Sequence, residues 1–434
     1  MHESPRVHRL FTLHGPGVYQ DNVALLVVSI RLGPFCKDRC SLALIYQPER
    51  YPVIRNFKRT AAIVGVVAAS SATLVACGDS NDSTTTTTEG EAATATSAAT
   101  EAAGAGDYEL SGQTGTLVAE GASSQQNAMD YFGSVYSSEV PGANLAYTPS
   151  GSGAGIKNFI AKQAVFAGSD SPLKDGEVEQ AKERCEGNDA WHLPFVIGPV
   201  AIAYNLEGVD ELNLTVDNLI DIFKGEITNW NDPKIAESNP DAALPDQNIT
   251  VFYRSDESGT SDNFQKFLVA ASDGKWDTTG KAFPNTVGTG ANGSSGVSQE
   301  VGATPGAITY VESGFVEQNG IASANIDFGS GPVELTAESV NNALEALEFT
   351  TEGNDMVVDS DALFASKETD AYPLVLTTYE IVCSAGYDEE TSNMVKDFLN
   401  LSLDSQDDEL EDAGFVPVTG KLAERLREAV NAIS

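Results

Sequence analysis

The chain has 434 residues and a formal net charge of −38. This length predicts more than one domain, and the charge argues against binding to nucleic acid or an anionic membrane surface. A small anion is not excluded, because charges beyond about 10 Å are screened while a pocket acts through donors at contact distance. His192 is the only histidine beyond residue 77, so no metal site and no cofactor are expected.

The first 107 residues fall into three segments of different composition. Residues 1–52 lack clear periodicity, and we interpret them as a non-native extension, with translation starting near Val53. Residues 53–76 have a basic start, a short apolar run and small residues before Cys77, as in a lipoprotein signal peptide. The alternative, a transmembrane anchor, would need about 20 apolar residues. Residues 77–107 are rich in Ser, Thr and Ala and predict a disordered tether behind a lipidated Cys77.

Two cysteines remain for the folded body, Cys185 and Cys383, since Cys36 and Cys40 lie in the N-terminal extension. In an exported protein, Cys185 and Cys383 could form one disulfide. Two buried free thiols are the alternative, and the sequence leaves both open.

From residue 108 onward, short β-branched runs alternate with amphipathic helices, which predicts an α/β protein with largely parallel sheets. A turn of small Ser and Gly residues followed by a helix occurs after three predicted strands, at 121–125, 150–153 and 258–261. Ligands of open α/β sheets bind at the carboxyl ends of strands, where helix N-termini offer free N–H groups. These turns therefore predict one binding region.

Two long apolar runs, 193–204 and 374–383, predict two crossings between two lobes with a ligand cleft between them. Lobe I is expected to comprise residues 108–200 and 376–434, and lobe II residues 201–375. The turns near residues 123, 152 and 170 would then face the turn near 258 across the cleft.

Arg254 ends a strand-like run and is followed by Ser258, Gly259 and Thr260 at a helix start. A guanidinium beside free N–H groups and hydroxyls suits a small oxyanion. The serines and the threonine could instead be plain helix caps, and Arg254 could form a structural ion pair with Asp256. Neither alternative excludes contact with a ligand.

Five stretches of the body carry a resemblance to a known family: Gly151–Gly153, Gly168–Leu173, Ile222–Asp232, Arg254–Ser261 and Pro305–Val311. Together they resemble the phosphate-binding lipoprotein of the bacterial phosphate-specific ABC importer, which has a type II periplasmic-binding-protein fold. The resemblance extends from about residue 115 to 430. It implies phosphate contacts from Ser152, Asp170, Arg254, Ser258, Gly259 and Thr260, with Asp256 orienting Arg254.

The chain departs from that family in the first turn. Where the family has a threonine whose hydroxyl contacts the anion, this sequence has Gln125, preceded by Ser124. Either the Ser124 hydroxyl replaces that contact or the Gln125 amide donates it, so both residues are candidates for the site.

Asp170 is predicted to select the anion. A carboxylate repels a fully deprotonated dianion but accepts a hydrogen bond from a protonated oxygen. Phosphate keeps such a proton at neutral pH and sulfate does not, so Asp170 would disfavour sulfate. The alternative role is to cap the helix predicted after Pro172.

The resemblance implies high-affinity binding of inorganic phosphate by a monomer anchored through Cys77 at the extracytoplasmic face of the bacterial membrane. Phosphate would pass to the transmembrane subunits of an ABC permease. A separate cytoplasmic ATPase would act there, since this chain has no Walker sequence. Alternatives are a binding protein for sulfate, molybdate or tungstate, and a surface role in adhesion or signalling.

A serine hydrolase is the enzyme alternative. Neither Ser152 nor Ser258 fits Gly-x-Ser-x-Gly, and a catalytic triad would depend on His192 alone. We therefore expect a binding protein that is not an enzyme.

Overall fold

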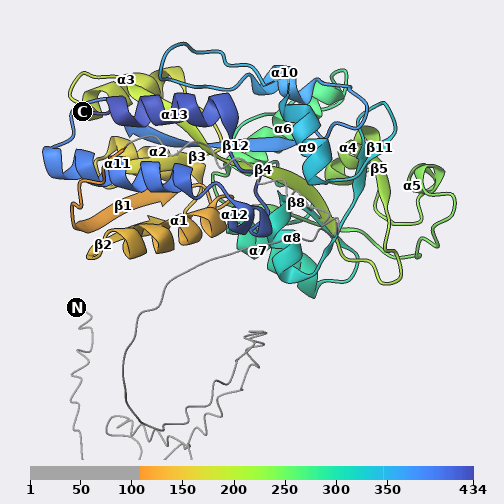
Figure 1. Ribbon diagram of the computed structural model, residues 1–434. Coiled ribbons are helices and arrows are strands. Elements are labelled where there is room, and N and C mark those ends of the chain that lie inside the picture. Colours follow the sequence, from red (N-terminus) through yellow and green to blue (C-terminus); the bar gives the residue numbers. More distant parts are fainter. Residues whose placement is uncertain (1–107, 346) are drawn as a thin grey trace, which may run out of the picture. The chain divides into compact units, whose positions relative to one another are not determined.

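The computed structural model describes residues 108–345 and 347–434 (Figure 1). The predicted N-terminal extension, signal peptide and tether, with Cys77, lie outside the described residues. Within the described part of the chain, no helix has both the length and the apolar character needed to cross a membrane.

Helices and strands alternate along the body. The N-terminal part comprises β1 (Gly115–Gly121), α1 (Gln126–Glu139), β2 (Ala143–Thr148), α2 (Ser152–Ile160), β3 (Phe166–Ser169), α3 (Asp175–Arg184) and β4 (Ala190–Tyr204). The middle part begins with β5 (Asn213–Thr215), α4 (Val216–Lys224), α5 (Pro233–Ser238), β6 (Thr250–Arg254), α6 (Gly259–Ala271), β7 (Thr289–Ala291) and α7 (Gly293–Ala303). It continues with β8 (Ala307–Glu312), α8 (Ser313–Asn319), β9 (Ala322–Ser323), β10 (Asn325–Asp327), β11 (Pro332–Val333), α9 (Ala337–Leu344) and α10 (Ser360–Phe364). The C-terminal part is β12 (Val375–Cys383), α11 (Glu389–Asp404), α12 (Asp408–Asp412) and α13 (Gly420–Ala432).

The main sheet has the strand order β2-β1-β3-β12-β4-β8-β6-β7, with β9 paired to β4, and β11-β10-β5 form a second, smaller sheet. Pairing is parallel among β1, β2 and β3 and again among β6, β7 and β8, as the alternating pattern predicts. β12 and β4 are antiparallel to each other and to their outer neighbours. The α/β class and the type II architecture are therefore confirmed.

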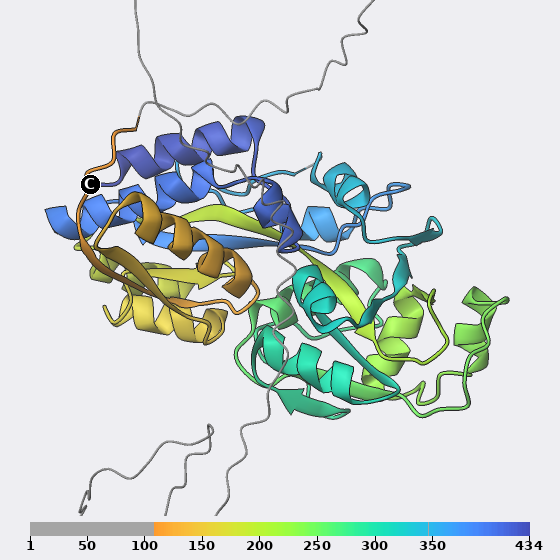
Figure 2. The same ribbon diagram turned by 60° about the horizontal axis from the view of Figure 1, so that its bottom comes forward.

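β4 connects the two groups of strands, as the long apolar run predicts. It pairs with β12 as far as Pro199 and with β8 from Val200 onward, and Figure 2 shows it, in yellow-green, running from one group toward the other. Every side chain from His192 to Tyr204 is buried, which explains why apolar and polar residues do not alternate along this run. The pairing of β4 changes at the boundary expected between the lobes, and the lobe division itself stays a prediction.

Strand alternation separates the two faces of the sheet around β1, β2 and β3. Phe166 belongs to the apolar cluster under α1, α11 and α13, whereas the next residue, Ala167, belongs to the cluster under α2 and α3. With both faces covered, the carboxyl ends of β1, β2 and β3 remain as the edge at which polar groups gather.

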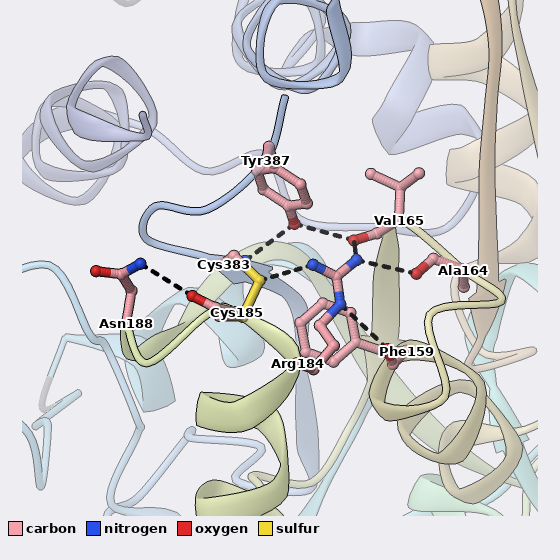
Figure 3. The surroundings of a disulfide bond; sticks show 8 residues. All are labelled: Phe159, Ala164, Val165, Arg184, Cys185, Asn188, Cys383 and Tyr387. Atoms are coloured by element: carbon pink, nitrogen blue, oxygen red, sulfur yellow. Dashed lines mark hydrogen bonds between the residues drawn. A yellow bond between two sulfur atoms is a disulfide. The ribbon is translucent and has the colours of Figure 1, made fainter. Parts of the chain in front are cut away.

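A disulfide joins Cys185, just after α3, to Cys383 at the end of β12 (Figure 3). Arg184 lies beside it, with Nη1 2.8 Å from Cys383 Sγ and Nη2 donating to the carbonyl of Val165 at 2.9 Å. The hydroxyl of Tyr387 accepts the N–H of Cys383 and donates to the same carbonyl. The end of β12 is thus fixed to α3 and to the start of β3.

Replacing Cys185 and Cys383 together by serine should lower the free energy of unfolding by about 3–5 kcal/mol, because the bond closes a loop with a sequence separation of 198. Urea denaturation followed by circular dichroism measures the loss. A reductant should produce a similar loss in the wild type and none in the double variant. A double variant as stable as the oxidised wild type would contradict this expectation.

Candidate anion-binding site

The N-termini of four helices, α1, α2, α6 and α7, meet at the ends of strands. Ser123 Oγ, before α1, accepts the backbone N–H of Ser294 in α7 at 2.9 Å. A methyl group added at Gly259 would lie only 2.4 Å from Ser152 Oγ, so α6 and α2 approach so closely that only glycine fits there. The N–H groups of a first helical turn have no carbonyl partner within the helix, and the helix dipole favours negative charge there. The convergence therefore suits an anion.

Asp170 lies at the centre of hydroxyl groups contributed by the starts of α1 and α2 and by β12. Its Oδ1 accepts from Ser124 Oγ at 2.6 Å and from Thr378 Oγ1 at 2.7 Å, and its Oδ2 accepts from Ser152 Oγ at 3.2 Å. Burial raises the pKa of Asp170, while the hydrogen bonds from Ser124, Thr378 and Ser152 and the charge of Arg254 oppose that rise. The site thus holds one buried carboxyl that is supported by three hydroxyls.

Arg254 is the buried cation of the site, with its side chain 2% exposed. Its Nε and Nη2 donate to the two carboxylate oxygens of Asp256 at 2.8 and 2.5 Å. Nη1 reaches Thr260 Oγ1 at 3.2 Å and Ser294 Oγ at 3.0 Å. Burial acts to raise the pKa of Asp256, but the hydrogen bonds and charge of Arg254 bring it below its ordinary value. Asp256 therefore stays ionised and fixes the plane of the guanidinium.

The start of α6 contributes Ser258, Gly259 and Thr260. Ser258 is the N-cap, and its Oγ accepts the N–H of Ser261 at 3.1 Å, which leaves its own hydroxyl proton free to donate. The N–H groups of Gly259 and Thr260 belong to the first turn. The cap and the donor roles are therefore compatible.

Residues of the N-terminal part and of the middle part of the chain contact one another around this region. Lys157 forms an ion pair with Glu257, and the N–H of Gly153 donates to the Glu257 carbonyl at 2.9 Å. Ser171 Oγ donates to Asp262 Oδ2 at 2.7 Å. Two hydrogen-bond networks contain Ser124, Ser152 and Asp170 on one side and Arg254 and Thr260 on the other, and these side chains and that of Ser258 are all buried.

Gln125 belongs to a different cluster. Its Nε2 donates to the hydroxyl of Tyr147 at 3.1 Å, and that hydroxyl donates to the carbonyl of Ala122 at 2.7 Å. A side chain at Gly168 would collide with both Gln125 and Tyr147. Of the two candidates in the first turn, Ser124 is the one whose side chain contacts Asp170. Gln125 instead donates to Tyr147, whose hydroxyl bonds to the backbone of the same turn.

Glu380 is a buried acid that sequence reasoning missed. It lies on β12 opposite Gly168, and neither of its carboxyl oxygens has a hydrogen-bond partner among the described residues. Burial raises the pKa of Glu380 to about 8, with Asp170 adding to the rise and the Gln125 amide opposing it. At neutral pH the carboxyl is therefore mostly protonated. The sequence feature that could have indicated Glu380 is the presence of an acidic residue inside the largely apolar run 374–383.

Replacing Glu380 by glutamine should remove a pH dependence of stability. The pKa rises from 4.5 to about 8 on folding, so the carboxyl's contribution is complete below pH 4.5 and is lost as the pH rises toward 8. Between these values the unfolding free energy of the wild type should fall about 1.4 kcal/mol per pH unit more steeply than that of Glu380→Gln. Urea titrations across this range measure the two slopes. The exposed Glu424→Gln should keep the wild-type slope, and equal slopes for Glu380→Gln and wild type would contradict the assignment.

Three further polar residues of the site were missed: Thr378, Ser294 and Glu312. Thr378 donates to Asp170, Ser294 accepts from Arg254, and Glu312 Oε1 accepts from Thr260 Oγ1 at 2.6 Å. Hydroxyls in an apolar run could have indicated Thr378, and the Gly- and Ser-rich stretch 288–296 could have indicated Ser294.

His192 is engaged away from the candidate serines. Its Nδ1 lies 2.7 Å from Asp355 Oδ1, and its Nε2 accepts the N–H of Leu173 at 3.0 Å. Both ring nitrogens therefore have partners, and neither of those partners is Ser152 or Ser258.

A family model described as a PBP superfamily domain matches residues 85–406. The chain is 42% identical over 382 residues to the phosphate-binding protein PstS3 of Mycobacterium bovis (strain BCG / Pasteur 1173P2), covering 87% of this chain and 100% of that protein. It is 39% identical over 384 residues to PstS2 of the same strain, with the same coverage.

Solved structures give the same fold. A high-affinity periplasmic phosphate-binding protein (PfluDING) bound with phosphate aligns with a TM-score of 0.57 at 21% identity, covering 72% of this chain and 93% of that one. The phosphate-binding protein from Stenotrophomonas maltophilia aligns with a TM-score of 0.55 at 20% identity and the same coverage. At these identities the likeness establishes the fold alone.

Proposed function

Because this chain belongs to the PBP superfamily and, within it, to the family of the PstS phosphate-binding proteins, we propose that it binds inorganic phosphate outside the cytoplasm and delivers it for import. The observation that carries the proposal is that one site contains two buried charged groups of opposite sign, the carboxyl of Asp170 and the guanidinium of Arg254. Asp170, held by three hydroxyls, faces helix starts that also surround Arg254. A carboxylate acceptor and a buried guanidinium together suit an oxyanion that keeps a proton.

Each group has a defined role in this proposal. When phosphate binds, the hydroxyls of Ser124 and Ser152 turn their protons from Asp170 to unprotonated phosphate oxygens, and the hydroxyl of Thr260 does the same from Glu312. Ser258 and the first-turn N–H groups donate to phosphate oxygens as well. Arg254 adds a charge-assisted donor. Asp170 accepts the remaining phosphate proton, and an anion without that proton meets an uncompensated repulsion.

Capture involves closure of the two lobes, residues 108–200 with 376–434 and residues 201–375. A ligand favours the closed state only through contacts made from both lobes at once. Ser124, Ser152 and Asp170 supply contacts from one lobe, and the start of α6 with Arg254 supplies contacts from the other. The contacts of Glu257 with Gly153 and Lys157 stabilise the same closed arrangement.

The closed protein, a monomer, docks on the transmembrane subunits of an ABC permease, and a separate cytoplasmic ATPase supplies the energy. A lipid on Cys77 and the tether behind it hold the binding protein at the extracytoplasmic face of the membrane. The protein performs no catalysis of its own. A hydrolase role has no support at His192, whose ring nitrogens already have partners.

Competition calorimetry tests the ligand. Phosphate should bind the wild type tightly at neutral pH, and a large excess of sulfate should leave the phosphate isotherm nearly unchanged. Molybdate and tungstate serve as further competitors, since they share the tetrahedral shape. Tighter binding of sulfate, molybdate or tungstate than of phosphate would overturn the assignment.

A further inference from the structure

Glu312 has an unpaired carboxyl oxygen in the candidate site. It is the last residue of β8, where that strand pairs with Val200 of β4, and it is 1% exposed. Its Oε1 accepts the hydroxyl of Thr260 at 2.6 Å. Its Oε2 is buried and has no hydrogen-bond partner among the described residues. A buried polar atom without a partner is costly, so a partner at this position would be strongly stabilising.

The hydrogen bonds of Thr260 place the Glu312 carboxyl among the groups of the candidate site. Thr260 Oγ1 donates to Glu312 and accepts from Arg254 Nη1 at 3.2 Å. The same Nη1 contacts Ser294 Oγ at 3.0 Å. Glu312 is therefore connected, through a single hydroxyl, to the cation and to the helix starts of the site.

Burial favours a proton on Glu312, and the charges around it act in both directions. Burial raises the pKa of Glu312, the charge of Arg254 and the hydroxyls of Ser294 and Thr260 oppose the rise, and the charge of Asp170 adds to it. Asp256, in the turn after β6, offsets the positive charge of Arg254, and Tyr310 on β8 is buried. A bound phosphate would add negative charge to the same surroundings and strengthen the preference for a proton.

We propose that Glu312 is a further ligand residue, and that capture of the phosphate dianion takes up one proton from solvent, held between Glu312 Oε2 and a phosphate oxygen. This inference rests on the proposed phosphate binding. Asp170 uses the proton that the dianion already carries, whereas Glu312 requires a second one. Where free phosphate is the dianion and Glu312 of the free protein is ionised, the affinity of the wild type should therefore fall about tenfold per pH unit.

Calorimetry in buffers of different ionisation enthalpy measures the protons taken up per phosphate. At mildly alkaline pH the wild type should take up about one proton more than Glu312→Gln. Glu312→Gln should also bind phosphate with a flatter dependence on pH. The matched control is Glu317→Gln, an exposed change on α8, the helix that Glu312 precedes, and it should keep the wild-type uptake.

The outcomes separate the two proposals. Phosphate binding with equal proton uptake in the wild type and in a folded Glu312→Gln overturns the role of Glu312 and leaves the proposed function intact. Phosphate binding by the wild type without proton uptake also overturns the role of Glu312 and leaves the proposed function intact. This outcome is measured on the wild type alone, so it does not depend on whether a variant folds. A wild type that binds another oxyanion but no phosphate overturns the proposed function, and this inference with it.

Discussion

Arg254→Ala should weaken phosphate binding by between about 30-fold and several thousand-fold. Removing one partner of a buried, hydrogen-bonded charge pair costs about 2–5 kcal/mol, and each 1.4 kcal/mol is tenfold in affinity. The variant loses the donor fork and also leaves Asp256, 7% exposed, without its cation. Isothermal titration of purified protein with phosphate at neutral pH measures the change.

Stability gives a second readout of the same variant. Arg254 lowers the pKa of Asp256, so this pairing contributes stability above the ordinary Asp pKa and loses it as the pH falls through the lowered value. The stability deficit of Arg254→Ala should therefore be large at neutral pH and shrink in acid.

Two other variants make the result specific to the guanidinium fork. Arg254→Lys keeps a positive charge but not the planar fork, and it should bind phosphate with intermediate affinity. Arg425→Ala removes a half-buried arginine on α13 that bonds to the carbonyl of Gly353, and it should keep wild-type affinity. Wild-type phosphate affinity in a folded Arg254→Ala would refute the proposed role.

The sequence predicts the parts of the site that lie in local turns. A strand, a turn of small residues and a helix form one local unit, so Ser152, Ser258 and Thr260 could be placed at helix starts from their neighbours alone. The same holds for Arg254 and Asp256, which are two residues apart. The long buried strand β4 could also be predicted from the sequence, since an unbroken apolar run is typical of a strand covered on both faces.

Residues contributed by non-local pairing could not be placed in this way. Thr378 and Glu380 reach the site because β12 inserts between β3 and β4, with Glu380 opposite Gly168. That register depends on pairing between segments about 200 residues apart, and a strand moved by one residue would turn each side chain to the other face. Glu312 depends in the same way on the pairing of β8 with β4.

Gln125 shows a limit of reasoning by position. Its place in the turn makes it one of two candidates for the anion contact, with Ser124, but a long amide does not occupy the space of a threonine hydroxyl. In the structure it reaches Tyr147 instead, and Gly168 leaves room for it. The neighbouring Ser124 has a side chain short enough to donate to Asp170.

Asp170→Asn should change the choice of anion rather than abolish binding. Asparagine can still accept from Ser124 and Thr378, but it is neutral and no longer repels an anion that lacks a proton. Sulfate should therefore bind more tightly and phosphate more weakly. Because like charges in contact cost several kcal/mol, the ratio of phosphate to sulfate affinity should fall on the order of 100-fold.

Separate titrations with phosphate and sulfate give that ratio, and Ser152→Ala is the matched control. It removes one donor to Asp170 without changing the charge of the site, so it should weaken both anions and leave their ratio nearly unchanged. Asp170 has a raised pKa, so its ionised form costs stability above that pKa, and Asp170→Asn should be at least as stable as the wild type at neutral pH. A stable Asp170→Asn with the wild-type ratio would show that selection against sulfate resides elsewhere. An altered ratio only in an unstable variant would point to a damaged fold.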